Sequence, residues 1–413
     1  MLEDEILRLL AESKGSLLDD IDLINTLQDS KVVSEEVTAQ LKTAEETVKK
    51  IDILRESYRP AANRSAVLFF VLNDLNLVDA MYQFSLDAYI ELFSKSILNS
   101  ESNVANVDDR VAAINEYHTQ SVYNSTCIGL FEKHKFLFSM HLSCSILMEE
   151  DKLPKEELAF FTYGCVNVDK NKQKKNPYDD WLNDAMWSNL EYLDLSIASF
   201  NGVLTCLQEN TDEWKIWISN NKPEECALPG IWDDKLTLFQ KLCIVRALRS
   251  DRVSYAATKF INGSLGPTFT NPPQFKLNEV FGLSNNKIPL IFLLSPGVDP
   301  TEQVQQLAKS YETNLIQIAL GQGQAPIALR AISESLQSGA WVFLSNCHLM
   351  LSWIPELEKT VENYCQSEIH ENFRLWLSCC PSPNFSITLL QRGIKITTEP
   401  PRGLVSLPSF LFR

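Results

Sequence analysis

The stretch Ile288-Pro-Leu-Ile-Phe-Leu-Leu294 is an apolar run of strand length, and the turn Ser295-Pro-Gly-Val-Asp-Pro300 follows it at once. A helix-period segment, 302–311, comes next, so the sequence predicts a buried strand that turns into a helix. A phosphate-binding loop occupies such a turn when it has the order G-x-x-x-x-G-K-[ST], because its amides surround the phosphates and its Lys reaches the outer ones. Here Gly297 is followed by Val, Asp, Pro, Thr and Glu, and no Gly-Lys pair occurs in the chain.

We interpret this turn as a vestigial loop: the topology of a nucleotide-binding module is present and its nucleotide chemistry is missing. Asp299 and Glu302 would direct negative charge toward a polyanion, which disfavours phosphate. The residues of the vestigial loop are Ser295, Pro296, Gly297, Asp299 and Pro300.

The sequence beyond Pro267 alternates strand and helix patterns, which is typical of an α/β fold. Three further apolar segments have the length of strands, and 325–336 has the period of a helix. Short apolar strands separated by helices predict a parallel sheet that is covered on both faces. The four expected strands lie at 288–294, 315–320, 339–344 and 373–377.

Two more strand-to-helix turns carry residues of possible functional interest. The turn after the second strand resembles a glycine-rich ligand loop, but a lone G-x-G favours a tight turn. The turn after the third strand lies where an ATPase of this topology holds magnesium with acidic residues, and it contains neither Asp nor Glu. Its side chains serve either plain turn chemistry or hydrogen bonds at a module boundary. The residues of the two turns are Gly321, Gln322, Gly323, Gln324, Asn346, Cys347 and His348.

The N-terminal half is expected to be mainly helical. Residues 1–58 have the pattern helix, break, helix, with Leu2, Ile6, Leu9 and Leu10 on one face and the break at Lys14-Gly15-Ser16. Ser34 is expected to cap the second helix, which ends at Tyr58-Arg-Pro60. Residues 65–97 and 110–260 are predicted to form helical core. The second helix carries a coiled-coil seam, formed by Val37, Leu41, Ala44, Val48 and Ile51.

Composition excludes several functional classes. The formal charge of -16 argues against a nucleic-acid binder, and the basic cluster at 170–175 is interpreted as a solvated loop. No signal peptide and no membrane-length apolar run is present, so we expect an intracellular protein. The ten cysteines lack paired spacing and are expected to be reduced.

No catalytic constellation is found. There is no G-x-S-x-G elbow, and the neighbours Cys347 and His348 cannot supply an opposed nucleophile and base. They also lack a second pair at the spacing that zinc requires, and His134 with His141 lack a completing ligand. We therefore expect no catalytic residue, no metal and no cofactor in this chain. Trp341, Trp353 and Trp376 are assigned to packing.

The same motifs, taken in order, resemble the sixth AAA+ module of dynein heavy chains. The resemblance rests on Leu293-Leu-Ser-Pro-Gly-Val-Asp-Pro300, Leu320-Gly-Gln-Gly-Gln324, Trp341-Val-Phe-Leu-Ser-Asn-Cys-His-Leu349, Ser352-Trp353, Phe373-Arg-Leu-Trp-Leu377 and Glu399-Pro-Pro-Arg-Gly-Leu404. The N-terminal half resembles the end of the fifth module, with the returning helix of its strut. That part of the resemblance rests on Leu2-Glu-Asp-Glu5, Ser30-Lys31, Ala44-Glu-Glu-Thr47, Ile51-Asp52, Tyr58-Arg-Pro60 and Met81-Tyr-Gln-Phe-Ser-Leu86. The motifs resemble those of axonemal rather than cytoplasmic dynein heavy chains.

The resemblance implies four segments. Residues 1–98 correspond to the end of the fifth module, 99–270 to the helical N-terminal part of the sixth, and 271–404 to its α/β core. Residues 405–413 form a divergent, truncated tail whose apolar side chains are expected to reduce solubility. The sequence also departs from the family at Asp79-Ala80, where Asp-Pro is usual.

The implied function is mechanical. The chain would be a structural part of an ATP-driven microtubule motor ring of the ciliary axoneme, and the family's ATP sites lie in its first four modules. The implied partners are the other AAA+ modules, and, through the full-length motor only, intermediate and light chains and microtubules. The implied location is the cytoplasm and cytoskeleton, in the axoneme. The alternatives are a regulatory adaptor that binds intact dynein and an autonomous nucleotide hydrolase.

Overall fold

The computed structural model describes residues 21–101, 106–165, 176–272, 276–365 and 367–400. Two compact units divide the chain. The first comprises Met1–Ala62 with Ser102–Ala112, and the second comprises Asn63–Glu101 with Ala113–Arg413. The first predicted helix, the basic cluster at 170–175 and the tail at 405–413 lie outside the described residues.

The first unit contains the long helix α2 (Ile21–Ser57). Its predicted start at Ser34 is wrong, because the helix already runs through this position and the Thr38 hydroxyl donates to the Ser34 carbonyl at 2.7 Å. Residues 21–33 contain no Gly or Pro, so nothing interrupts the helix before Ser34. The predicted end before Arg59 is confirmed.

The coiled-coil seam of α2 is exposed. Its larger side chains have exposed fractions of about half, which is far above the level of a packed seam. The fractions are 47% for Val37, 59% for Leu41, 55% for Val48 and 56% for Ile51. An isolated helix with such a seam depends on a partner helix for stability.

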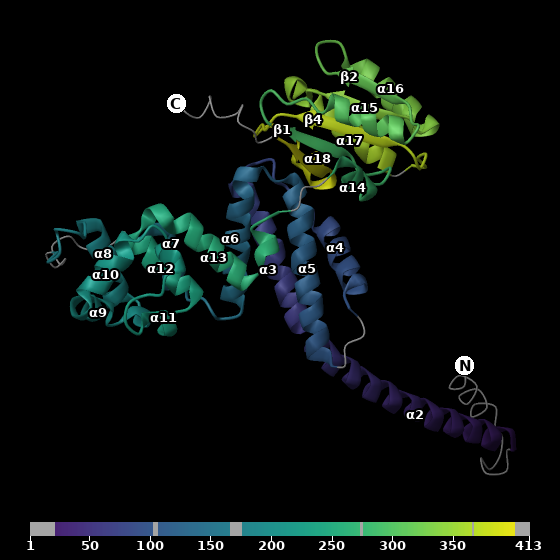
Figure 1. Ribbon diagram of the computed structural model, residues 1–413. Coiled ribbons are helices and arrows are strands. Elements are labelled where there is room, and N and C mark those ends of the chain that lie inside the picture. Colours follow the sequence, from purple (N-terminus) through teal and green to yellow (C-terminus); the bar gives the residue numbers. More distant parts are fainter. Residues whose placement is uncertain (1–20, 102–105, 166–175, 273–275, 366, 401–413) are drawn as a thin grey trace. The chain divides into compact units, whose positions relative to one another are not determined.

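The second unit begins with a helical segment, which confirms the predicted helical core (Figure 1). Tyr82, Tyr123 and Phe138 are among its fully buried side chains. Its helices are α3 (Arg59–Asp74), η1 (Leu75–Leu77), α4 (Leu86–Asn99), α5 (Val107–Gly129), α6 (Glu132–Glu149), α7 (Lys155–Tyr163), α8 (Asp184–Ser196), η2 (Ala198–Phe200), α9 (Val203–Glu209), α10 (Thr211–Ser219), η3 (Pro223–Glu225), α11 (Trp232–Lys235), α12 (Leu238–Leu248), η4 (Ser250–Arg252), α13 (Val253–Ser264) and η5 (Pro267–Phe269).

An α/β module follows in the same unit, shown in green to yellow in Figure 1. Its sheet has five parallel strands in the order β2-β3-β4-β1-β5. The fold prediction is confirmed, but the predicted number of four strands is wrong because β5 was missed. The elements are α14 (Leu277–Gly282), β1 (Leu290–Leu294), α15 (Thr301–Ser310), β2 (Leu315–Ala319), α16 (Ala325–Ser338), β3 (Trp341–Ser345), η6 (Cys347–Met350), α17 (Ile354–Cys365), β4 (Arg374–Cys379), α18 (Ile387–Arg392) and β5 (Ile394–Thr398).

The two faces of the sheet belong to two different apolar clusters, because successive side chains of a strand point to opposite faces. Leu290, Phe292, Phe343 and Trp376 pack with α14 and α15. On the other face Ile291, Leu293, Val342, Leu344 and Leu377 pack with α16, α17 and α18. Every residue of β1 and β3 is buried, which explains their continuous apolar sequences.

Candidate functional site

The vestigial loop is a tight turn at the carboxyl end of β1. The Ser295 amide donates to the Thr398 carbonyl of β5 at 3.1 Å, and the Val298 amide donates to the Ser295 carbonyl at 3.2 Å. Gly297 has a φ of +82°, a conformation that favours glycine. The turn therefore continues the sheet's hydrogen bonding and leads directly into α15.

A carboxylate of the chain itself, that of Asp299, lies at the N-terminus of α15. Asp299 Oδ1 accepts from the Thr301 amide at 3.0 Å and from the Thr301 hydroxyl at 2.5 Å. Pro300 has no amide hydrogen to offer a ligand. A phosphate at this helix end would have to displace a carboxylate from the amide that it needs. Asp299 thus occupies the first amide of α15 from the position before the N-cap residue Pro300, a contact that its position in the sequence did not reveal.

The turn after β2 is compact. The Gln324 amide donates to the Gly321 carbonyl at 3.1 Å, and Gly323, with a φ of +80°, allows the chain to reverse. Gln322 is exposed, and α16 begins at once with a proline in its first turn. The geometry is that of a strand-to-helix connection, with Gly321 and Gln324 engaged with each other.

The turn after β3 is tied to the end of β4. Asn346 has a φ of 61°, and its backbone amide donates to the Ser378 hydroxyl at 3.2 Å. His348 Nδ1 accepts from the Cys380 backbone amide at 3.2 Å. Cys347 is fully buried, and burial raises the pKa of its thiol to about 12. These contacts hold the ends of β3 and β4 together. The buried Cys347 thiol supplies no reactive thiolate.

The three tryptophans assigned to packing are buried, which confirms that assignment. The exposed fractions are 1% for Trp341, 5% for Trp353 and 0% for Trp376. Trp341 and Trp376 lie in the sheet core, with ring centroids 5.5 Å apart.

A cavity of about 910 Å³ is lined by residues that include parts of α5, α6, β1, α15 and β5, and sequence reasoning missed it. Its apolar floor includes Phe292 and Ile396. Its charged lining residues, among those described, are Glu132, Lys135 and Glu399. Lys135 forms an ion pair with Glu132, so the lining carries a net charge of about -1 and repels a nucleotide phosphate. The walls come from segments that are up to 277 residues apart, 123–136 and 396–400, so no local pattern announces them.

The histidines at 134 and 141 have separate partners. Tyr82 Oη lies 2.7 Å from His134 Nδ1, and His141 Nε2 lies 3.2 Å from an Asp74 carboxylate oxygen. Within the described ranges, no group of three or more His, Cys, Asp or Glu side chains is placed to hold a metal ion. The same ranges contain no helix that has both the length and the apolar character of a membrane span.

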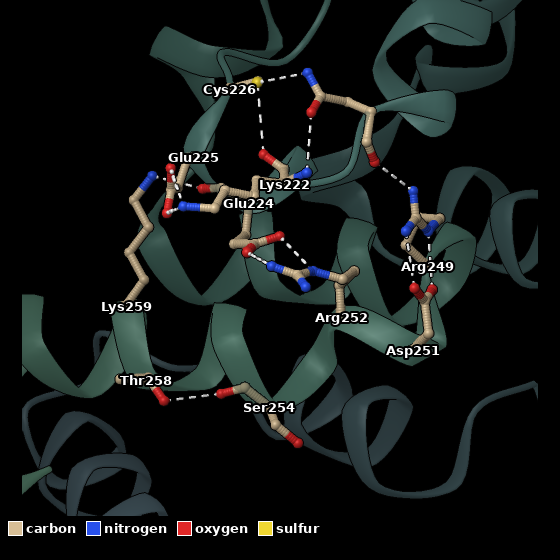
Figure 2. Close-up of polar contacts among 11 residues, drawn as sticks. Lys222, Glu224, Glu225, Cys226, Arg249, Asp251, Arg252, Ser254, Thr258 and Lys259 are labelled. Carbon is tan, nitrogen blue, oxygen red and sulfur yellow. Dashed lines mark hydrogen bonds and ion pairs between the residues drawn. The ribbon is translucent and has the colours of Figure 1, made fainter.

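A second polar cluster lies in the helical segment, around η3 and the start of α13 (Figure 2). Glu224 pairs with Arg252 and Asp251 pairs with Arg249, and the hydrogen bond from Arg252 lowers the pKa of the Glu224 carboxyl. Lys259 Nζ donates to the Glu224 carbonyl at 2.7 Å. The two arginines are thus paired with carboxylates and Lys259 with a carbonyl, so the cluster ties η3 to the start of α13.

A parallel sheet in the order β2-β3-β4-β1-β5, with its loop-to-helix turn after β1, which lies between β4 and the edge strand β5, defines an α/β module of the P-loop, AAA+ type. Residues 285–397 match the family model described as "Dynein heavy chain region D6 P-loop domain".

Similarity to known proteins extends over almost the whole chain. The chain is 49% identical to "Dynein axonemal heavy chain 2" of Mus musculus over 405 residues, which are 98% of this chain and 9% of that protein. The Homo sapiens protein of the same name is 48% identical, with the same coverage. "Dynein-1-beta heavy chain, flagellar inner arm I1 complex" of Chlamydomonas reinhardtii is also 48% identical, again over 98% of this chain and 9% of the relative. The chain belongs to the dynein heavy-chain family, and it spans 9% of the length of these relatives.

Proposed function

We propose that this chain is a structural portion of an axonemal dynein heavy chain whose α/β module does not bind nucleotide. The observation that carries the proposal is the carboxylate of Asp299 on the Thr301 amide, at the place where a phosphate would need that amide free. The missing Lys and the absence of Asp and Glu from residues 345–348 support it from the sequence. The same observations argue against an autonomous nucleotide hydrolase.

The proposed organisation has four segments. Residues 1–98 form the end of the fifth AAA+ module, 99–270 the helical part of the sixth, 271–404 its α/β core, and 405–413 a divergent tail. The family match at 285–397 falls within the third of these segments. In this arrangement the chain helps to close a motor ring and passes strain between its strut and its ATP-hydrolysing side.

The proposed partners and location follow from the relatives. Names such as "Dynein axonemal heavy chain 2" and "flagellar inner arm I1 complex" support a place in the cytoskeleton of the ciliary axoneme. The direct partners are then the other AAA+ modules of the ring. Intermediate chains, light chains and microtubules are reached only through the full-length motor.

We expect no saturable ATP binding at physiological magnesium. Isothermal titration of the 413-residue chain with Mg-ATP, together with titration of a fluorescent ATP analogue, measures this. A working P-loop ATPase under identical conditions is the positive control. The Asp299→Asn variant should also fail to bind, because removing the carboxylate restores neither the Lys nor the metal-binding acid.

Binding in the low-micromolar range that is abolished at Gly297, for example by Gly297→Val, would overturn the proposal. That result would mean that the turn rearranges around phosphate and that Asp299 leaves the Thr301 amide. A saturable ATP signal that survives Gly297→Val would also contradict the prediction, and it would locate the nucleotide site outside the vestigial loop.

The exposed seam of α2 supports a second candidate function, that of an adaptor which binds intact dynein through this helix. An apolar seam at coiled-coil spacing is a surface for a partner helix. A pull-down from ciliated-cell extract with the chain and with a Leu41→Glu, Val48→Glu variant tests it. Recovery of full-length heavy chain by the first and not by the second would favour the adaptor.

The α2 helix is expected to open readily in the monomer, because its seam has no partner within the described residues of the first unit. Amide hydrogen exchange of 34–57 should approach the rate of an unstructured peptide to within about tenfold. Protection in a verified monomer would mean that the seam is paired in a way not foreseen. Protection in a dimer alone would show that the seam recruits a second copy.

A further inference from the structure

The edge strand β5 and the residue after it carry three polar side chains at alternate positions, Lys395, Thr397 and Glu399. All three belong to the second unit, as do the backbone groups that they contact. Each of these side chains contacts a backbone group at or near a helix end, and its charge or polarity suits that end. Such groups otherwise require water or a dedicated cap.

Lys395 is a buried cation that lies among carbonyl groups. The residue is 7% exposed, and its Nζ donates to the Leu390 carbonyl in the last turn of α18 at 2.8 Å. Nζ also donates to the Gln83 carbonyl at 2.5 Å and lies 3.4 Å from the Gly393 carbonyl. The Phe84 ring centroid lies 4.7 Å from it.

These contacts offset part of the cost of burying the charge. A helix C-terminus carries partial negative charge and attracts a cation. Desolvation nevertheless lowers the pKa of Lys395 to about 7. Among the described residues, the contacts of Lys395 Nζ are with backbone carbonyls and an aromatic ring. One of these, Gln83, lies 312 residues away in the sequence and belongs to the helical segment.

Thr397 and Glu399 engage the turn between α5 and α6. The Thr397 hydroxyl lies 3.1 Å from the Ile128 carbonyl and 3.0 Å from the Leu130 carbonyl, at the C-terminal end of α5. Glu399 Oε1 accepts from the amide of Glu132, the first residue of α6, at 3.1 Å. A hydroxyl donor thus meets a helix C-terminus and a carboxylate meets a helix N-terminus.

Gly129 allows this close approach. A Cβ at this position would lie 3.0 Å from Lys395 Cβ and 3.2 Å from the Lys395 carbonyl oxygen, closer than side chains normally pack. The same turn is held from its other side, because Tyr82 Oη accepts from the Phe131 amide at 3.2 Å. The strand, the α5–α6 turn and the segment around Gln83 therefore form one continuous polar contact.

We propose that Lys395, Thr397 and Glu399 form a joint between the edge of the parallel sheet and the helical segment. Thr397 and Glu399 hold the α5–α6 turn directly. Lys395 is the positioning residue: it holds the Gln83 carbonyl, next to Tyr82, whose hydroxyl accepts from the Phe131 amide of the turn. Displacement of the helical segment is then carried into the sheet through β5. The role of the joint in a motor rests on the proposed function. The joint deepens that function by naming the residues that pass strain between the helical segment and the α/β module.

Hydrogen exchange of the full chain, with Lys395→Met beside the matched control Lys359→Met on the exposed face of α17, tests the joint. Methionine keeps much of the apolar stem and removes the donors. We expect the Phe131 and Glu132 amides to exchange about tenfold faster in Lys395→Met, with β3 unchanged. Lys359→Met should match the unchanged chain at both places.

Two outcomes would overturn the joint. Unchanged exchange at Phe131 and Glu132 would mean that Lys395 does not hold the turn. An equal increase in β3 and at the turn would mean that Lys395 contributes only general stability.

If Lys395→Met does not fold, Thr397→Val and the pair Glu399→Gln and Glu399→Ala carry the test. Glutamine keeps an acceptor for the Glu132 amide. That amide should therefore exchange more slowly in Glu399→Gln than in Glu399→Ala. Equal exchange in the two Glu399 variants, with no effect of Thr397→Val, would reject the joint. The ATP titration is independent of all these readouts, so failure of the joint is distinguishable from failure of the proposed function.

Discussion

Replacing Trp376 by alanine is expected to lower the free energy of unfolding of the α/β module by about 4 kcal/mol. Trp376 lies within β4 and is 0% exposed. Its ring centroid lies 5.5 Å from that of Trp341 and 5.7 Å from that of Phe292. Both neighbours belong to strands of the sheet, so they cannot move into the cavity without disturbing the strand pairing. The loss therefore includes both the transfer of the indole and an unfilled cavity.

Urea unfolding and hydrogen exchange of the β3 and β4 amides measure this loss. Exchange is the more specific readout, because a chain with two units need not unfold in one step. Tyr163→Ala is the control: Tyr163 is 71% exposed, and its loss should change stability by less than about 0.5 kcal/mol. A cost below about 1 kcal/mol for Trp376→Ala would contradict the packing described for this face of the sheet.

The predicted strands include those buried on both faces: residues 290–294 and 341–345 are buried throughout, and 290–294 and 341–344 are unbroken apolar runs. The edge strand β2 is partly exposed and was predicted as well, because Leu315-Ile-Gln-Ile-Ala319 is mainly apolar and carries no charge. β5 was missed because Ile394-Lys-Ile-Thr-Thr398 lies at the sheet edge and carries Lys395, which indicates an exposed position when its surroundings are unknown. Its burial depends on the Gln83 carbonyl, 312 residues away. No local pattern contains that contact.

The turn at 295–300 lies between β1 and α15, as the sequence predicts, but the contact made by one residue in it was not foreseen. The missing Lys is a local fact and could be read directly. Asp299 was expected to direct charge toward a ligand, whereas it accepts from the Thr301 amide at the start of α15. Asp at a cap and Asp at a ligand site look alike in sequence, because both place a carboxylate beside a helix start. The start assigned to α2 failed for a related reason, since Ser34 suits both a cap and an exposed position inside a helix.

Acidification is expected to destabilise the helical segment through His118. This side chain is 1% exposed on α5, with Nε2 2.9 Å from the Tyr89 hydroxyl and Nδ1 3.0 Å from the Ser96 hydroxyl. Its environment contains hydroxyls and the Phe93 ring, whose centroid lies 4.9 Å away. Burial lowers the pKa of His118 from 6.5 to about 4, because a charged imidazole loses its hydration there.

The sign of the effect follows from the direction of the shift. Above pH 6.5 the imidazole is neutral in both states, so folding is not penalised. Between pH 6.5 and about 4 the unfolded chain binds a proton at this imidazole and the folded chain does not. The free energy of unfolding therefore falls as the pH is lowered. A shift of this size corresponds to a loss of about 3 kcal/mol by pH 4.

Comparison of the unchanged chain with His118→Gln isolates this contribution from that of the carboxyl groups, which titrate in both. Urea unfolding at pH 7 and pH 4 should show the unchanged chain losing about 3 kcal/mol more than the variant. His141→Gln is the matched control: the His141 side chain is 39% exposed and faces Asp74, so this variant should follow the unchanged chain. Parallel losses in all three proteins would mean that His118 can take up its proton without leaving the core, and that water or a local opening reaches it between α4 and α5.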